Sequence, residues 1–187
     1  MAFDVLSSFA GNFKLDWAVA KTRTPFQPTT NNDGLVAGVA YTLGVGTNQI
    51  NQLSSTIVDV PAGAPGSFEV DLTGGGLVNV LTEPAVTFSN VRLLFVKLLT
   101  PLDKDTAGLP IGNPNTGVVV MGGATAPWPF LKSPSGTIEL ESGDFHLQVR
   151  RTAGLPVTLT TADRLKFTNS DAVNVAKVLL VLAGTGS

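Results

Sequence analysis

The 187-residue chain contains no cysteine and a single histidine, and only 14% of its residues are charged. Without cysteine there is no disulfide framework, no thiolate metal site and no cysteine nucleophile. A single histidine removes the usual way of building a catalytic zinc site, which takes two or three imidazoles. We therefore expect no catalytic residues, no metal and no other cofactor, and we do not expect an enzyme.

The net charge is also small, because 12 Lys and Arg oppose 14 Asp and Glu, giving −2 at pH 7. A nucleic-acid-binding domain concentrates positive charge on one face, so we expect no nucleic-acid partner. The mean hydropathy is +0.28, whereas about a quarter of the residues in a typical soluble domain are charged. Part of the surface is therefore expected to be covered, as it is in an obligate oligomer.

No uninterrupted apolar run reaches the roughly 20 residues of a membrane-spanning helix. The two longest uncharged stretches, residues 34–58 and 106–131, are interrupted by amides and glycines or by prolines. Asp4 stands where a secretion signal carries basic residues, and no apolar block of roughly 7–15 residues follows it. We expect no membrane partner and no signal peptide.

The chain is rich in apolar residues that alternate with polar ones at a period of two, which is typical of strands with one buried face. The segments with this pattern are residues 13–20, 68–73, 138–141, 145–150, 157–160 and 164–168. In the fourth segment the pattern predicts that Phe145, Leu147 and Val149 face the core. It places His146 on the polar face.

Two segments are apolar at almost every position, Phe88–Leu99 and Val173–Ala183. Each is long enough for a short helix, and Leu and Lys favour a helix in the first. Frequent β-branched residues and neighbouring strands instead favour central strands that are covered on both faces. We prefer the central strands.

Turn-forming Gly, Pro, Ser, Asn and Asp separate these segments at short intervals. Short strands at this spacing predict an all-β protein, an antiparallel β-sandwich of jelly-roll type with about 8–9 strands. A Greek-key sandwich of another topology fits the same count, because order along the chain does not fix strand pairing. We assign this domain to residues 53–187.

Residues 1–52 are different in character. They are expected to add a strand pair to the same domain, or to form an arm that packs on a neighbouring subunit. Phe3, Leu6 and Phe9 recur every three residues in a segment too short for a stable free helix. These three side chains are candidate interface anchors.

A second pair of candidate anchors is Trp128 and Phe130, each preceded by a proline. Proline keeps this segment out of a central strand. The two aromatic side chains therefore either cap the sandwich core or anchor a contact between subunits, where aromatic residues are enriched.

Few residues offer chemistry. His146 has no serine elbow of the kind a catalytic triad requires. The carboxylates that lie two residues apart on strands are typical of a solvent face, although glycosidases use such separations. These pairs are Glu69 with Asp71 and Glu139 with Glu141. The loop acids of residues 31–33 and 103–105 lack the calcium-loop pattern, so we interpret them as solvated turn residues.

Two long segments share a characteristic order of alternating strands, turns and apolar strands. Ser55–Lys97 combines an alternating Phe-Glu-Val-Asp-Leu strand, a Gly-rich turn and an apolar strand that reaches a lysine. Gly136–Gly184 ends with a Leu-Lys-Phe-Thr-Asn-Ser turn before a last apolar strand. Over residues 54–184 the chain thus resembles the small β-sandwich virion proteins of tailed bacteriophages. The resemblance rests on strand order and style.

That resemblance implies a jelly-roll-like subunit, often a homotrimer, that decorates or cements a capsid or belongs to a head fibre or tail. It implies that the partners are further copies of the chain and other virion proteins such as the major capsid protein. It also implies a place in the virion after synthesis in the host cytoplasm. It supplies no catalytic residues.

We therefore expect a structural virion protein of a tailed phage, a capsid decoration or head-fibre subunit that acts through protein–protein contacts. The alternative is a carbohydrate- or receptor-binding β-sandwich module. In that module Trp128, Phe130 and acidic strand faces would form the site.

Overall fold

The computed structural model describes residues 8–14, 36–63, 66–74, 76–78, 85–105, 107–131, 133, 135–150 and 152–186. Contacts divide the chain into two compact units, Met1–Leu43 and Gly44–Ser187. Within the described ranges every regular element is a strand, and no helix long and apolar enough to cross a membrane is found there.

The first unit contains an antiparallel pair, β1 (Ser8–Lys14) and β2 (Val36–Leu43). Ser8 lies opposite Thr42, and Lys14 lies opposite Val36. A strand pair near the N-terminus was one of the two expected forms of this region. Of the alternating segment 13–20, the first two residues belong to β1 and the others lie outside the described residues.

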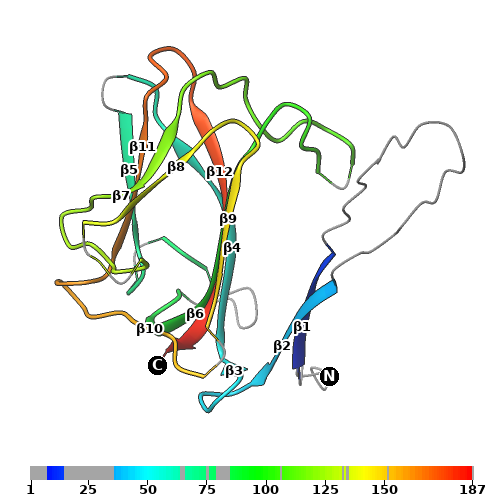
Figure 1. The fold of residues 1–187 in the computed structure, drawn as a ribbon, viewed down its shortest axis with the longest axis vertical. Helices are drawn as coiled ribbons and strands as arrows, with labels where there is room; N and C mark the ends of the chain where they lie inside the picture. The colour runs from blue at the N-terminus through cyan, green and yellow to red at the C-terminus, as the bar shows by residue number, and fades with distance from the viewer. Residues whose placement is uncertain are drawn as a thin grey trace, which may run out of the picture. The chain divides into compact units, whose positions relative to one another are not determined.

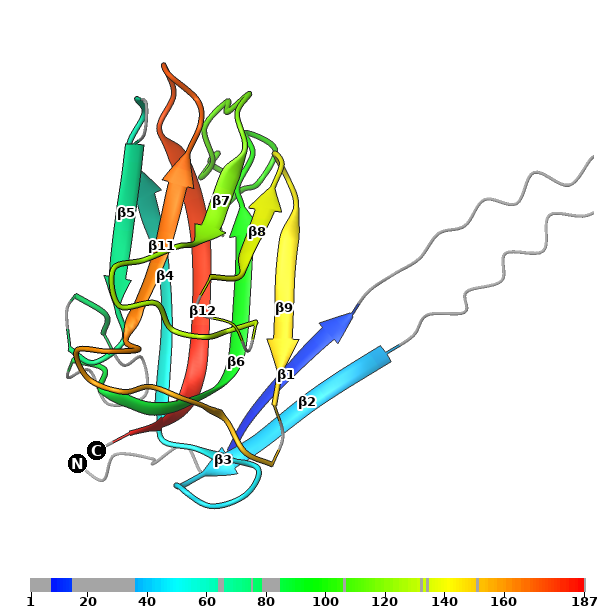
Figure 2. The ribbon, with the colours of Figure 1, turned by 60° about the vertical axis from the view of Figure 1, so that its left-hand side comes forward.

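The second unit is built from the remaining strands. They are β3 (Gln49–Ile50), β4 (Gln52–Val60), β5 (Gly66–Asp71), β6 (Phe88–Leu98), β7 (Val119–Gly122), β8 (Thr137–Leu140), β9 (Phe145–Val149), β10 (Leu155–Pro156), β11 (Arg164–Asn169) and β12 (Ala176–Gly186). One sheet has the order β10-β6-β12-β4, with β9 also pairing with β6, and the other has the order β5-β11-β7-β8. Figure 1 shows these two layers, and Figure 2 shows the order of the strands within them.

The strand pairs of the second unit are nested along the chain. The first long strand, β4, pairs with the last, β12, and inside this pair β5 pairs with β11, β6 with β9, and β7 with β8. The pairs β12·β6 and β11·β7 then join these four strand pairs into two antiparallel sheets. This nested order of eight strands is the jelly-roll topology, so the predicted fold class is confirmed.

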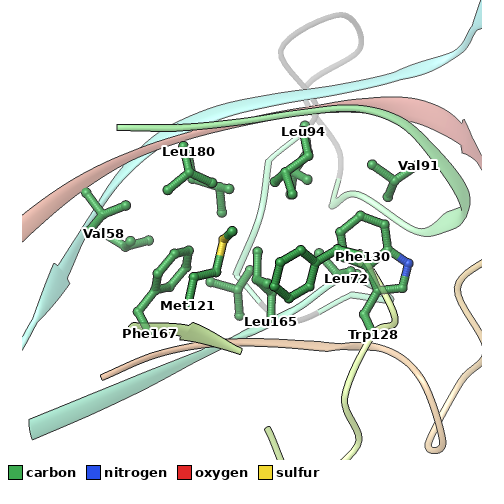
Figure 3. Close-up of a cluster of buried hydrophobic side chains, with 14 of the residues drawn as sticks. Val58, Leu72, Val91, Leu94, Met121, Trp128, Phe130, Leu165, Phe167 and Leu180 are labelled. Atoms are coloured by element: carbon green, nitrogen blue, oxygen red, sulfur yellow. The ribbon is translucent and has the colours of Figure 1, made fainter. Parts of the chain in front are cut away.

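The core lies between the two sheets, where apolar side chains from both inner faces leave water together. Figure 3 shows Leu94 and Leu180 of one sheet opposite Met121 and Phe167 of the other. All four side chains are buried. Close packing of this kind holds the layers at a fixed separation, and each sheet is left with one outer face.

The two apolar segments form the central strands of their sheet, as predicted. β6 and β12 pair with each other over most of their length, and each has another strand on its far side. The helical alternative for Phe88–Leu99 is therefore wrong. Tertiary pairing outweighs the modest helix propensity of Leu and Lys.

One predicted strand is a turn. Val157 packs against the core, but residues 159–161 form a turn closed by a bridge between Thr158 and Ala162. Thr160 has a φ of 68°, which is rare for a β-branched residue. Its amide donates a 2.7 Å hydrogen bond to the Asp163 carboxylate, which holds this conformation. The predicted strand at residues 157–160 is therefore wrong, although its Leu and Thr residues alternate as they would in a strand.

Candidate interaction surface

Trp128 and Phe130 belong to the segment between β7 and β8 that bridges the two sheets. The Trp128 amide donates to the Arg164 carbonyl oxygen at 2.9 Å, and its indole Nε1 donates to the Pro156 carbonyl oxygen at 3.1 Å. The Gln148 side chain donates to the Phe130 carbonyl oxygen at 2.7 Å. The segment is thereby bonded to β11 of one sheet and to β9 and β10 of the other.

Both aromatic side chains are core residues, with exposed fractions of 1% for Trp128 and 2% for Phe130. Their ring centroids are 6.2 Å apart, at one side of the cluster in Figure 3. This is the core-capping alternative of the two that the sequence left open. In the single chain neither ring is exposed to anchor a contact, and the binding-module hypothesis loses its aromatic platform.

The other three candidate anchors lie in the N-terminal unit. Phe3 and Leu6 are outside the described residues. Phe9 is part of β1, opposite Tyr41, and its side chain is also outside the described part of the structure. Their role as anchors stays a prediction.

His146 faces the interior of the sandwich, not the polar side that alternation predicted. Its ring meets the Phe130 ring edge-on, with centroids 6.4 Å apart, and it lies opposite Val96 of β6. The Nε2 atom is buried and has no hydrogen-bond partner. Burial lowers the pKa of His146 below its ordinary value, because the charged imidazolium loses its hydration there. A neutral histidine without an orienting carboxylate is a packing residue.

The two faces of β9 are exchanged relative to the prediction, so its large apolar residues lie on the outer face of the sheet. Phe145 is 52% exposed and Leu147 is 37% exposed, although both were predicted to face the core. His146 and Gln148 occupy the inner positions because both contact Phe130. The prediction failed because it assumed a polar outer face.

The outer face of this sheet is apolar. Three rows of outward-facing residues cross β4, β12, β6 and β9, and they alternate with core residues along the strands. The rows are Ile57, Leu179, Lys97 and Phe145; Ser55, Val181, Phe95 and Leu147; and Leu53, Ala183, Leu93 and Val149. Ten of these twelve positions are apolar. We call these twelve residues the apolar outer face. Leu53, Ala183 and Leu93 of the third row are already buried in the chain, so the exposed part of this face lies in the first two rows.

The few charges on or beside this face are paired within the chain. Lys97 forms an ion pair with Asp103, and Lys177 Nζ lies 2.8 Å from Asp59 Oδ1 at the end next to the first row. Burial alone would raise the pKa of Asp103, but bonds from Lys97 and Thr100 outweigh it and hold this pKa below its ordinary value. The face therefore carries no excess of either sign.

The outer face of the other sheet is polar. Its outward-facing residues, which we call the polar outer face, are Ser67, Glu69, Asp71, Thr137, Glu139, Arg164, Lys166 and Thr168, together with Val120. Glu69 lies opposite Lys166 and Asp71 opposite Arg164, so the charges alternate in sign across the strands. Such pairs are typical of a sheet face in water.

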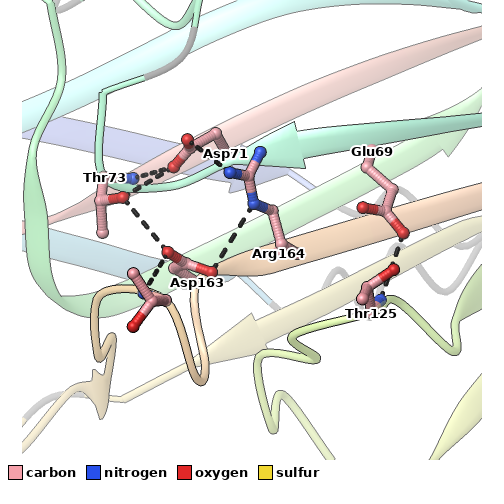
Figure 4. A network of polar contacts seen from close by, with 7 residues as sticks. Glu69, Asp71, Thr73, Thr125, Asp163 and Arg164 are labelled. Carbon is pink, nitrogen blue, oxygen red and sulfur yellow. Dashed lines mark hydrogen bonds and ion pairs between the residues drawn. The ribbon is translucent and has the colours of Figure 1, made fainter.

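Figure 4 shows the ion-pair network at one end of the polar outer face. Arg164 lies 3.1 Å from Asp71 and 3.7 Å from the buried carboxylate of Asp163. Burial alone would raise the pKa of Asp71, but hydrogen bonds from Thr73 and the charge of Arg164 hold this pKa below its ordinary value. The carboxylate Glu69 accepts a bond from the Thr125 amide at 3.2 Å.

Several of the acids considered as candidates for chemistry are thus engaged in folding contacts, whereas Glu139 and Glu141 are exposed. Asp71 belongs to the ion-pair network, and Asp103 and Asp105 accept bonds from amides of their own loop. In the described parts of the chain, no group of three or more His, Asp or Glu is placed to hold a metal ion. The loop acid Asp33 lies outside those parts.

A buried polar cluster that the sequence did not reveal fixes the loop between β11 and β12. Asn169 is fully buried, donates to the Asn174 carbonyl oxygen at 2.9 Å and accepts from Asn115 Nδ2 at 3.2 Å. Asp171 accepts bonds from the amides of Asn174 and Thr116, which hold its pKa well below its ordinary value. The residue types at positions 169–171 indicate only a turn, although Asn169 and Asp171 also brace a second loop.

Comparison with models of protein families, with curated proteins and with solved structures finds no match to this chain. What the chain does must therefore be inferred from the arrangement of its own residues. Among those that the structure describes, the largest departure from an ordinary soluble jelly roll is the apolar outer face.

Proposed function

We propose that the chain is a structural subunit that acts through protein–protein contacts, most concretely a capsid decoration or head-fibre protein of a tailed phage. The observation that supports this proposal is the exposed part of the apolar outer face, which includes Ile57, Phe145 and Leu147. An antiparallel sheet ordinarily keeps one face in water and has polar residues there. A sheet that is apolar on both faces is suited to being covered by another protein.

The assembly class and the phage setting have different support. The apolar outer face, the small net charge and the involvement of the acids in folding contacts support an assembly subunit. The resemblance of residues 54–184 to small phage β-sandwich proteins supports the virion. On this proposal the partners are further copies of the chain, in the trimer that the resemblance implies, and the major capsid protein.

The test is to purify particles from a lysogen or phage that encodes this chain and to count the copies per particle by quantitative mass spectrometry. A decoration or fibre protein is expected at a fixed, high ratio to the most abundant particle protein. The ratio should be constant across the density-gradient fractions that contain intact particles. Absence of the chain from those fractions would refute the virion role.

A further inference from the structure

The side of β4 that faces away from β12 is an open edge of its sheet. β4 is the last strand in its sheet order, and in the part of the chain that the structure describes β12 is its only strand partner. The Leu99 amide donates to the Lys177 carbonyl oxygen at 2.8 Å, so the backbone groups of Lys177 point toward β6. Those of the next residue, Val178, therefore point toward Val58 of β4.

Because this direction alternates along a strand, Ser55, Ile57 and Asp59 direct their N–H and C=O groups to the open edge of β4. All three residues are exposed. Between described residues, no hydrogen bond reaches the backbone groups of these three positions. A row of unpaired backbone groups is a template for pairing with another strand.

Three other sheet edges of the second unit carry features that oppose such pairing, and β4 does not. β10 contains Pro156, β5 carries the acids Glu69 and Asp71, and β8 is four residues long. Proline, charge and short length are devices that natural proteins use on open edges. β4 has nine residues and contains no proline, glycine or lysine. Its single charge, on Asp59, is already paired with Lys177.

The sequence of β4 is complementary to itself in one antiparallel register. With Ile57 opposite Ile57 of a second copy, Ser55 lies opposite Asp59, so a hydroxyl meets a carboxylate and no like charges meet. Centring the pair on Asp59 would set two carboxylates against each other and Ile57 against Pro61, which has no N–H. Centring it on Ser55 would set Ile57 against Leu53, which is buried in its own chain.

We propose that β4 of a second copy pairs with β4 about a two-fold axis through Ile57, so that the two sheets become one continuous sheet. This inference rests on the proposed assembly role and names the strand that serves it. The three open residues of each chain would exchange about six backbone hydrogen bonds. An unrelated extended segment finds the same backbone groups but not this match of side chains, which is why we assign the edge to a second copy.

The first experiment measures the mass of the full-length protein by sedimentation equilibrium over a range of concentrations. A strand pair is narrower than a standard interface, so the wild type is expected to form a weak dimer that dissociates on dilution. Ile57→Pro removes an N–H that the pairing with β12 does not use, and proline is tolerated at a sheet edge. It is expected to raise the dissociation constant about tenfold or more. The matched control Ile57→Val keeps the N–H and should change the constant less than about threefold.

The second experiment remains decisive if Ile57→Pro does not fold. The chain has no cysteine, so single cysteines can be placed along β4 and joined by a thiol cross-linker with a span of about 5 Å. Two Ile57→Cys chains are expected to be joined, because directly opposite residues lie about 5.5 Å apart between Cα atoms. Two Ser55→Cys chains are not, because in this register their cysteines lie about 14 Å apart along the strands. A mixture of Ser55→Cys and Asp59→Cys chains is expected to give a cross-linked heterodimer.

Several results would overturn the inference. They are a monomer at every concentration, an unchanged dimer in folded Ile57→Pro, and cross-linking of Ser55→Cys alone that equals that of Ile57→Cys. A trimer that Ile57→Cys does not cross-link would overturn it as well. A monomer that still copurifies with particles would overturn the β4 pairing and leave the assembly role standing. A dimer that cross-links through Ile57→Cys but is absent from particles would support the pairing and refute the virion role.

Discussion

The two sheets of the jelly roll share one core but present opposite outer faces. On the polar outer face Glu69 lies opposite Lys166, and Asp71 forms an ion pair with Arg164 of the neighbouring strand. The apolar outer face has Phe95 and Phe145 in contact, with ring centroids 6.0 Å apart. The fold is compatible with either chemistry, because only the inner faces have to be apolar for the layers to pack.

The difference between the two outer faces indicates which surface of the β-sandwich is the better candidate for a functional contact. A polar outer face is already satisfied by water and by its own ion pairs. An apolar one leaves a free energy of roughly 25 cal/mol per Å² to be gained from any partner that removes it from water. The inner and outer positions of the same strands should therefore respond differently to mutation.

The largest expected effect contrasts an inner and an outer phenylalanine. Phe167→Ala deletes a fully buried ring between the sheets and should lower the free energy of unfolding by about 3–5 kcal/mol. Phe145→Ala, measured in the dissociated chain, should lower it by less than about 1 kcal/mol, because half of that ring is already in water. Urea unfolding at low protein concentration measures both. Equal losses would mean that Phe145 is packed like a core residue.

A smaller effect contrasts the ion pairs of the two sheets. Arg164→Gln leaves the buried Asp163 carboxylate and Asp71 without their cation and should cost about 1–2 kcal/mol, since Arg164 itself is partly hydrated. Lys177→Gln breaks the exposed pair with Asp59 and should cost less than about 0.5 kcal/mol. Thermal unfolding of the two variants gives the comparison. A larger loss for Lys177→Gln would reverse the assignment of the structural network to the polar outer face.

The smallest expected effect is a pH dependence that arises inside the sheet with the apolar outer face. Because burial lowers the pKa of His146 below its ordinary 6.5, the unfolded chain binds that proton first as the pH falls. The free energy of unfolding should therefore be constant above about pH 6.5 and decrease below it, down to the pKa of the folded state.

The chain has a single histidine, so His146→Gln should abolish this slope and nothing else in that range. The lowered pKa values of Asp71 and Asp103 act in a separate window, from their ordinary 3.8 downward, where stability is lost as the pH falls through the folded-state values. Urea unfolding between pH 5 and 8 tests the histidine alone. A slope that survives in His146→Gln would assign it to another group.

Much of the fold could be predicted from local patterns. β11 alternates Leu165 and Phe167 with polar neighbours, and the inner residues are buried as the period of two requires. The segments of β6 and β12 were predicted to be central because they are apolar at both parities. The same segments were also expected to be covered on both faces, whereas Leu179, Val181 and Phe95 are only half-buried on the outer face.

The features of the fold that could not be predicted depend on which strands become neighbours. In β9 the alternation of apolar and polar residues was predicted correctly, but the apolar set was assigned to the wrong face of the sheet. The alternation alone does not say which face is the core. The ion pair between Arg164 and Asp71 could not be predicted from local patterns, because β5 and β11 lie far apart in the sequence. The position of Trp128 likewise depended on where the bridging segment crosses between sheets.

The nested pairing of β4 with β12 has a consequence for biosynthesis. A ribosome that has released β4 to β11 has produced a chain whose central strand is still missing, because β12 pairs with both β4 and β6. Until β12 emerges, two strand edges stay open and can pair with other nascent chains. The protein therefore folds late and slowly, and fusions or truncations near Ala176–Gly186 should affect its yield more than equal changes near Ser8–Lys14.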